Sequence, residues 1–416
     1  MIHSPIDVPR KIPAYAWVVF ALTFGLLISD YMARQVLNAV FPLLKAEWNL
    51  TDGQLGFLSG VVALMVGLLT CPISLLADRW GRVKSIAAMA CVWSAATLYC
   101  GVAETYGQLL AGRVVVGIGE AAYGSVGIAV ILSVFPRHLR ATLTGAFMAG
   151  GLAGQMLGVS MGGAIAASHG WRMAFIAIGI GGLMLAVAYA TLVRDSLLQA
   201  NDNCDRAKFT MASLKSLFSG RSLNCSYVAS GLQLFVAAAI AAWLPTYFVR
   251  YYDLPLGKAA SLAAIFLGIG GAGMVGCGIA SDRLVSDSNK RALLAGGFCL
   301  GSTLSVGAAF AVGPGMPQVL LLGLAMFFAA STAGPAGAMV ANLTPKALHG
   351  TAFAVLTLAN NAFGLAAGPI VTGWLADRIG LLGAMQWLPA ASLAAALVFL
   401  AAARGAQPEH ATPRTA

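Results

Sequence analysis

Charged side chains are scarce in this chain of 416 residues. Lys, Arg, Asp and Glu together make up 10% of it, whereas a soluble globular protein carries about 25%. Hydrophobic residues make up 59%, so too few polar side chains remain to cover a water-soluble body of this length. The composition excludes a soluble enzyme and a soluble nucleic-acid-binding protein, and it predicts an integral membrane protein.

Residues that catalyse reactions or bind metals are also few. The seven cysteines contain no C-x-x-C pair and lie mostly inside apolar runs, where they act as small buried hydrophobic residues. The five histidines fall in tails or loops, and no nucleotide-binding motif is present. We therefore expect no cofactor, no metal site and no enzymatic activity, and a source of energy other than ATP.

Long apolar runs are what the chain has in abundance. A helix needs about 20 apolar residues to cross a bilayer, and no alternation typical of membrane strands appears. We predict an all-α membrane protein with twelve transmembrane helices in two six-helix bundles. The predicted spans are residues 15–40, 54–77, 84–103, 106–134, 141–167, 171–193, 223–249, 257–281, 292–312, 317–340, 351–376 and 382–403.

A polar stretch at the midpoint divides the chain. We predict an N-terminal bundle over residues 1–193, a cytoplasmic linker over residues 194–222, and a C-terminal bundle with a short tail over residues 223–416. The two bundles repeat each other, because the motif P-R-x-L-x-x-T that starts at Pro136 returns as P-K-x-L-x-x-T from Pro345. A parallel repeat of six spans predicts a substrate path between the two halves.

Basic residues are distributed unevenly between the loops. Of the 25 Lys and Arg residues, 18 fall on the side of the membrane that holds both termini and five on the other side. Basic loops stay in the cytoplasm, so we predict that both termini are cytoplasmic. The formal net charge of +10 arises on this side, and it therefore indicates topology rather than a nucleic-acid partner.

A family resemblance rests on the loop between the second and third spans. Residues 74–84 read S-L-L-A-D-R-W-G-R-V-K, which resembles the G-x-L-A-D-R-x-G-R-[RK] signature of the major facilitator superfamily. The resemblance implies alternating access and a loop that latches the two halves in one state. The residues implied in this gating loop and its weaker second copy are Asp78, Arg79, Gly81, Arg82, Asp282 and Arg283. Anchoring of the topology by positive charge is the alternative interpretation.

Four charged residues fall inside predicted spans: Asp30, Arg34, Arg113 and Glu120. Each would cost about 2.5–3.5 kcal/mol at a helix centre exposed to lipid, so we expect them to pair and to face a cavity. Asp30 and Arg34 are four residues apart and can bridge each other. We predict that Asp30 and Glu120 carry the coupling proton, with Arg34 and Arg113 as charge partners or as binding groups for an anionic substrate. A static ion-pair network is the alternative.

The sequence around these charges narrows the resemblance. Residues 112–125, G-R-V-V-V-G-I-G-E-A-A-Y-G-S, resemble the fourth helix of the Spinster-like branch. The first helix is similar to the N-Y-x-D-R pattern of that branch, with the acid at Asp30 and alanine at Ala33, where the branch has Asp. The resemblance implies a proton-coupled carrier of lipid-like or other amphipathic molecules. The alternatives are a proton symporter for organic anions, of the hexuronate or aromatic-acid type, and an uncoupled facilitator.

Uncharged polar and aromatic residues inside spans are candidates for lining the cavity, although each can instead form a helix–helix contact. They are Tyr123, Gln155, Gln233, Trp243, Tyr247, Asn360 and Asn361. A second pattern, the glycines at 150, 154, 158 and 162, predicts close packing of the fifth span. We expect a monomer in the inner or plasma membrane whose partners are a small-molecule substrate, protons and the lipid bilayer.

Overall fold

The computed structural model describes residues 14–194, 218, 220–285, 287–345 and 348–405. Within these ranges the chain is helical and forms no strand. The first half contains α1 (Ala14–Trp48), α2 (Asp52–Trp80), α3 (Arg82–Gly101), α4 (Tyr106–Glu120), α5 (Tyr123–Val134), α6 (Arg137–His169) and α7 (Trp171–Leu192). The second half contains α9 (Arg221–Tyr251), α10 (Leu256–Leu284), α11 (Ser288–Ala311), α12 (Met316–Ala329), α13 (Ala333–Leu343), α14 (His349–Ala359), the π-helix η3 (Asn360–Ala366), α15 (Ala367–Gln386) and α16 (Leu388–Gly405).

These helices form the twelve predicted spans. Ten helices of the described part are long and apolar enough to cross a membrane. The other two spans are α6, of 33 residues, and residues 381–405. The last two spans are separated at Gly380, whose φ of +79° lies in the left-handed region that favours glycine. The expected helical fold is confirmed, and most of the predicted linker, residues 195–217 and 219, lies outside the described residues.

The fourth and tenth spans are each broken at mid-length. The fourth changes from α4 to α5 after Glu120, and the tenth changes from α12 to α13 after Ala329. Such breaks leave carbonyl groups without helical partners. Thr70 Oγ1 donates to the Ala121 carbonyl at 2.6 Å, and Gln233 Nε2 donates to the Phe328 and Ala329 carbonyls at 3.2 and 3.3 Å. A polar side chain from a neighbouring helix thus satisfies each break.

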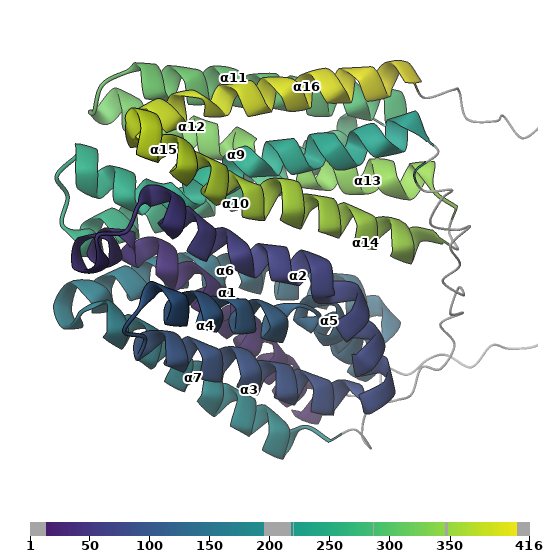
Figure 1. Cartoon of the computed structure of the whole chain (residues 1–416). Helices are drawn as coiled ribbons and strands as arrows, with labels where there is room; N and C mark the ends of the chain where they lie inside the picture. The colour runs from purple at the N-terminus through teal and green to yellow at the C-terminus, as the bar shows by residue number, and fades with distance from the viewer. Residues whose placement is uncertain (1–13, 195–217, 219, 286, 346–347, 406–416) are drawn as a thin grey trace, which may run out of the picture.

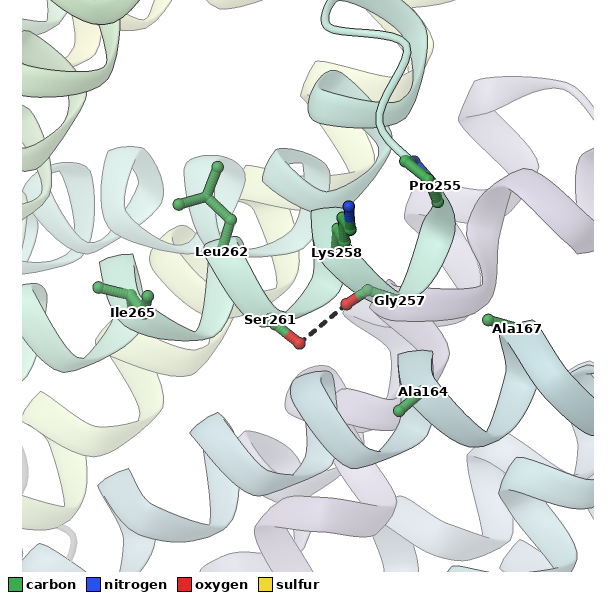
Figure 2. A pocket seen from close by; sticks show the side chains of 8 residues that line it. All are labelled: Ala164, Ala167, Pro255, Gly257, Lys258, Ser261, Leu262 and Ile265. Carbon is green, nitrogen blue, oxygen red and sulfur yellow. Dashed lines mark hydrogen bonds between the residues drawn. The ribbon is translucent and has the colours of Figure 1, made fainter.

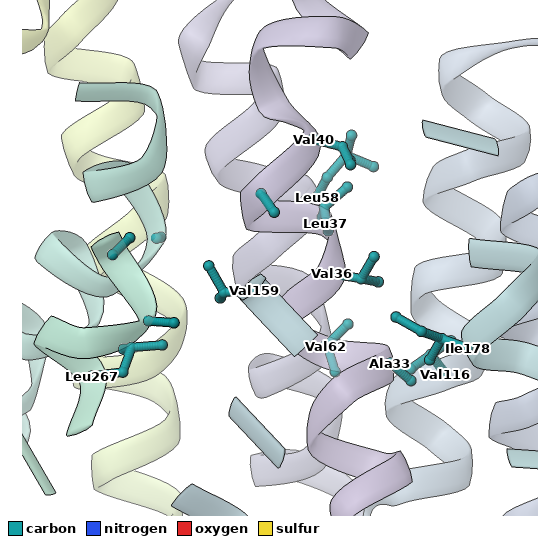
Figure 3. Close-up of a cluster of buried hydrophobic side chains, with 14 of the residues drawn as sticks. Ala33, Val36, Leu37, Val40, Leu58, Val62, Val116, Val159, Ile178 and Leu267 are labelled. Carbon is teal, nitrogen blue, oxygen red and sulfur yellow. The ribbon is translucent and has the colours of Figure 1, made fainter. Parts of the chain in front are cut away.

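The first helix lies at the centre of the first half and is packed on several sides. Figure 3 shows this buried apolar cluster, in which side chains of α1 meet side chains of α2, α4, α6 and α7 and lie opposite α10. The labelled members are Ala33, Val36, Leu37, Val40, Leu58, Val62, Val116, Val159, Ile178 and Leu267.

The glycine stripe of the fifth span packs against α1. A Cβ atom added at Gly154 would lie 2.6 Å from the Ile28 carbonyl oxygen, and one at Gly158 would lie 2.8 Å from the Met32 Cα atom. No side chain fits at these positions without displacing α1. The stripe therefore brings two helices of the same half together, as small residues do in membrane bundles.

Helices α2 and α15 bring the two halves together (Figure 1). A Cβ atom added at Gly60 would lie 2.6 Å from the Ala366 carbonyl oxygen, and Gly56 faces the Pro369 carbonyl. The halves are therefore in backbone contact along this pair of helices.

Polar contacts between the halves cluster at the end of the bundle that holds the α1–α2 turn. We call this end of the bundle the far end, because α1 begins and α16 ends towards the opposite end (Figure 1). Asp52 accepts hydrogen bonds from Arg250 at 2.6 and 2.8 Å and one from Lys45 at 2.6 Å. Asp377 accepts from the backbone N–H groups of Asp52 and Gly53 at 2.7 and 2.8 Å. The Asp377 carboxylate thus caps the N-terminus of a helix in the opposite half, where negative charge is stabilising. These five residues are the far-end latch.

The opposite end, where α7 ends and α9 begins, carries the predicted gating loop. Gly81 has a φ of +94° in the tight turn between α2 and α3. Arg79 is exposed, and the Asp282 side chain is 73% exposed beside Arg291 within its own half. The far-end latch joins the two halves through Asp52–Arg250 and through Asp377 with the N–H groups of Asp52 and Gly53. This arrangement is latched at the far end.

Replacing Asp377 with Asn is expected to open the far end. The amide cannot accept both backbone hydrogen bonds as a carboxylate does, and each bond to a charged group contributes about 1.5–3 kcal/mol. We expect the equilibrium to shift about tenfold or more towards a state open at the far end. The measurement is the distance between spin labels at Glu104→Cys and Met316→Cys in a variant without native cysteines.

The matched control for this experiment is Asp253→Asn, which removes an exposed carboxylate at the same end. This variant should leave the distance distribution unchanged. An unchanged distribution in Asp377→Asn as well would show that the latch does not hold the far end closed.

Candidate functional site

A cavity of about 360 Å³ lies between the two halves. Its walls come from α1, α2 and α6 of the first half and from α9, α10, α12, η3 and α15 of the second. The volume is at the lower end of the range typical of small-molecule pockets. The cavity can therefore hold a small organic molecule in contact with both halves.

The charged group on the cavity wall is the guanidinium of Arg34. Its Nε and Nη2 atoms donate to Glu120 Oε2 at 3.0 and 2.8 Å, and this is an ion pair between α1 and α4. The Arg34 side chain is 15% exposed, whereas the Glu120 side chain is fully buried behind it. The guanidinium also lies over the ring of Tyr31, 5.3 Å from its centroid.

Asp30 lies beside this ion pair but does not form the predicted bridge with Arg34. It is 4% exposed, and its Oδ1 atom has no hydrogen-bond partner among the described residues. Glu120 Oε1 also lacks a partner there. The structure thus contains two buried acids on α1 and α4, each with a carboxyl oxygen that has no partner among the described residues.

Arg113 is fully buried and does not line the cavity. Its guanidinium donates to the α1 carbonyls of Ala33 and Arg34 at 2.8 and 3.0 Å, and to the α2 carbonyl of Leu58 at 3.4 Å. Arg113 therefore joins three helices, and the structure does not place it to bind a substrate anion.

A ridge of polar side chains follows Arg34 along the first half. Ser59 Oγ donates to Asn38 Oδ1 at 2.8 Å, and Asn38 Nδ2 donates to Gln35 Oε1 at 2.6 Å. This chain of bonds leaves the amide of Gln35 as a donor next to Arg34. Tyr31, Gln35 and Asn38 recur at three- or four-residue spacing on the cavity face of α1. The cavity wall is thus rich in hydrogen-bond donors around one cation, which suits an anion.

Four further polar residues line the cavity and were not expected there from the sequence: Tyr31, Gln35, Asn38 and Ser59. A helical projection centred on Arg34 identifies the three on α1, because they share its face. Of the seven expected cavity residues, only Gln155 on α6 lines the cavity.

The other expected cavity residues in the second half make helix–helix contacts. Trp243 Nε1 donates to the Pro369 carbonyl at 3.2 Å, and Tyr247 is hydrogen-bonded to Gln318. Asn360 accepts a hydrogen bond from Ser230, and Gln233 binds the carbonyls at the helix break.

The remaining two residues are Asn361 and, in the first half, Tyr123. Asn361 donates to the Thr357 carbonyl within its own span, and Tyr123 donates to the Thr23 carbonyl of α1 at 2.5 Å. Neither lines the cavity. All six expected residues other than Gln155 are thus engaged in bonds that hold helices in place.

A second hollow lies on the surface between α6 and α10, and Figure 2 shows it from close by. It is shallow, and apolar side chains such as Leu262 and Ile265 line most of it. Its hydroxyl group is engaged, because Ser261 Oγ donates to the Gly257 carbonyl at 2.8 Å. Lys258 is its one charged residue. The hollow is separate from the cavity and contains none of the four buried charges.

Known proteins resemble this chain along most of its length. The Major Facilitator Superfamily matches residues 23–361. A probable L-galactonate transporter of Escherichia coli is 30% identical over 326 residues, which cover 74% of this chain and 71% of the relative. An MFS-type efflux pump of Mycolicibacterium smegmatis is 28% identical over 405 residues, which cover 95% and 91%.

A solved structure has the same fold. A bacterial homologue of the human lysosomal transporter Spinster superposes with a TM-score of 0.83 at 20% identity, over 94% of this chain and 98% of the other. The likeness extends across both halves of the chain. Together with the family match, it shows that this chain belongs to the Major Facilitator Superfamily and is a multi-pass membrane transporter.

Proposed function

We propose that this transporter couples the movement of a small organic anion to a proton. The observation that supports this function is the Arg34–Glu120 ion pair on the cavity wall, with Asp30 buried beside it. A cation at the wall of a donor-rich cavity binds an anion, and a buried pair of acids holds a proton. The site therefore contains both parts that coupled transport needs.

The ion pair links the two binding events. An anion that reaches Arg34 competes with Glu120 for the same N–H donors. When the anion displaces it, Glu120 becomes a buried carboxylate without a cation, and protonation removes the cost of that charge. Binding of the anion therefore favours uptake of a proton by Glu120 or Asp30. Release of the anion restores the ion pair and expels the proton.

The chemistry of the cavity favours an organic anion over a lipid as the substrate. A volume of about 360 Å³ has little room for a long acyl chain, and the polar ridge surrounds a single cation. We further propose that the protein is a monomer of the inner membrane with both termini in the cytoplasm, because the basic loops lie on that side. The far-end latch then faces outward, and the cavity exchanges with the cytoplasm.

Carboxylates should raise the melting temperature of the purified protein through Arg34, whereas lysophospholipids should not. Arg34→Gln combined with Glu120→Gln removes both members of the ion pair, so neither is left as a buried charge without its partner, and this variant should lose the shift. Arg113→Gln loses hydrogen bonds worth about 1.5–3 kcal/mol each, so its own melting temperature should fall by about 5 °C or more. It should still respond to carboxylates. A larger shift with a lysophospholipid panel would contradict the proposal.

Asp30→Asn and Glu120→Gln should abolish proton-driven accumulation of a carboxylate in vesicles. Neither variant can take up and release a proton at its altered position, so transport should only equilibrate the two sides. Exchange of labelled for unlabelled substrate should continue, since it needs no net proton movement. The measurement is uptake of a radiolabelled carboxylate with and without an imposed pH gradient.

Glu104→Gln is the matched control for this assay, because Glu104 is an exposed carboxylate at the far end. It should accumulate substrate as the native protein does. If Asp30→Asn and Glu120→Gln both concentrate substrate along a pH gradient, neither acid carries the coupling proton. If the native protein shows no response to the gradient, the transporter is an uncoupled facilitator.

A further inference from the structure

The two walls of the cavity differ in chemistry. The first half contributes Arg34 and the polar side chains of Tyr31, Gln35, Asn38, Ser59 and Gln155, together with Ala63, Met148, Gly151 and Leu152. The second half contributes only apolar residues among those described, including Leu234, Ala238, Ala241, Leu267, Met274 and Met326. A molecule in the cavity therefore meets hydrogen-bond donors on one side and hydrocarbon on the other.

Polar residues lie on the same helices as the apolar wall, but their side chains form hydrogen bonds with other helices. Gln233, on the same helix as Ala238 and Ala241, is fully buried and binds the carbonyls at the break in the tenth span. Asn360 accepts the hydroxyl of Ser230. Turning either side chain into the cavity would break a buried hydrogen bond, which costs about 1–3 kcal/mol. The wall therefore stays apolar, because these hydrogen bonds hold the nearby polar side chains away from the cavity.

We infer that the transported anion has an apolar body and that the apolar wall excludes polyhydroxylated sugar acids. This inference rests on the proposed function, which places the carboxylate at Arg34. A hydroxyl group directed at Ala238 or Ala241 loses its water and finds no partner, so it binds poorly. A hydrocarbon ring or chain buries apolar area there instead. Ala238 and Ala241 thus determine specificity, in contrast with what the name of the L-galactonate relative suggests for that protein.

Pairs of acids with the same carbon skeleton test this inference. Hexanoate and galactonate share a six-carbon chain, and cyclohexanecarboxylate and quinate share a six-membered ring. Each pair differs in hydroxyl groups and keeps one carboxylate. Calorimetric titration of the purified full-length protein should give a dissociation constant for each apolar acid that is at least about 100-fold lower than that of its hydroxylated partner.

Substitution of the wall should change this ratio in a predictable direction. Ala241→Asn adds a donor and an acceptor where the structure has a methyl group. It should bind the hydroxylated acids more tightly, so the ratio of the two dissociation constants in each pair should fall at least about threefold. Ala241→Leu has a similar volume without polarity, and its preference should remain on the apolar side. Ala238→Ser tests the same wall with a smaller change, in case the asparagine variant does not fold.

The outcomes separate this inference from the proposed function. Tight binding of galactonate and quinate, at or above the affinity of their apolar partners, overturns the inference and leaves the anion site intact. If no carboxylate binds, and the paired Arg34→Gln and Glu120→Gln variant behaves as the native protein does, the proposed function itself fails. A preference for the apolar acids that is lost with Arg34 supports both.

Discussion

The ion pair between Arg34 and Glu120 is the interaction on which the site depends. An isolated charge inside a membrane costs several kcal/mol, so the two arginines need partners inside the bundle. Arg34 bridges α1 to α4, and Arg113 binds the α1 carbonyls of Ala33 and Arg34. These contacts fix the rotation of α1. That rotation directs Tyr31, Gln35 and Asn38 into the cavity.

The two halves have the same arrangement of helices, but their side chains at the cavity differ in chemistry. Both break their fourth span, counted within each half, and both satisfy the break with a polar side chain from a neighbouring helix. In the first half the break follows Glu120 directly, so the helix ends at the acid of the ion pair. In the second half the Gln233 amide donates to the carbonyls at the equivalent break and is therefore not free to line the cavity. One half thus keeps the ionisable groups, and the other presents an apolar surface that moves against it.

Much of this architecture could be predicted from the sequence, because the bilayer constrains it. Hydropathy predicted the twelve spans, and the cost of buried charge identified the four residues of the cluster. The pairing within the cluster was not predictable, since Arg34 can reach Asp30 along the helix and only the rotation of α4 directs it to Glu120. Of the two interpretations open for Gln233, the structure shows the helix–helix contact, because the break in the tenth span creates carbonyl acceptors that hydropathy does not reveal.

The burial of Asp30 has a consequence for the order of events in the proposed cycle. Asp30 and Glu120 are both nearly inaccessible, and Arg34 stands between Glu120 and the cavity. In that cycle a proton that enters from the cavity reaches Glu120 only after the ion pair has opened. The substrate anion opens that pair by taking the guanidinium. In this order a proton without a substrate finds no accessible acid, which prevents the gradient from leaking through the empty transporter.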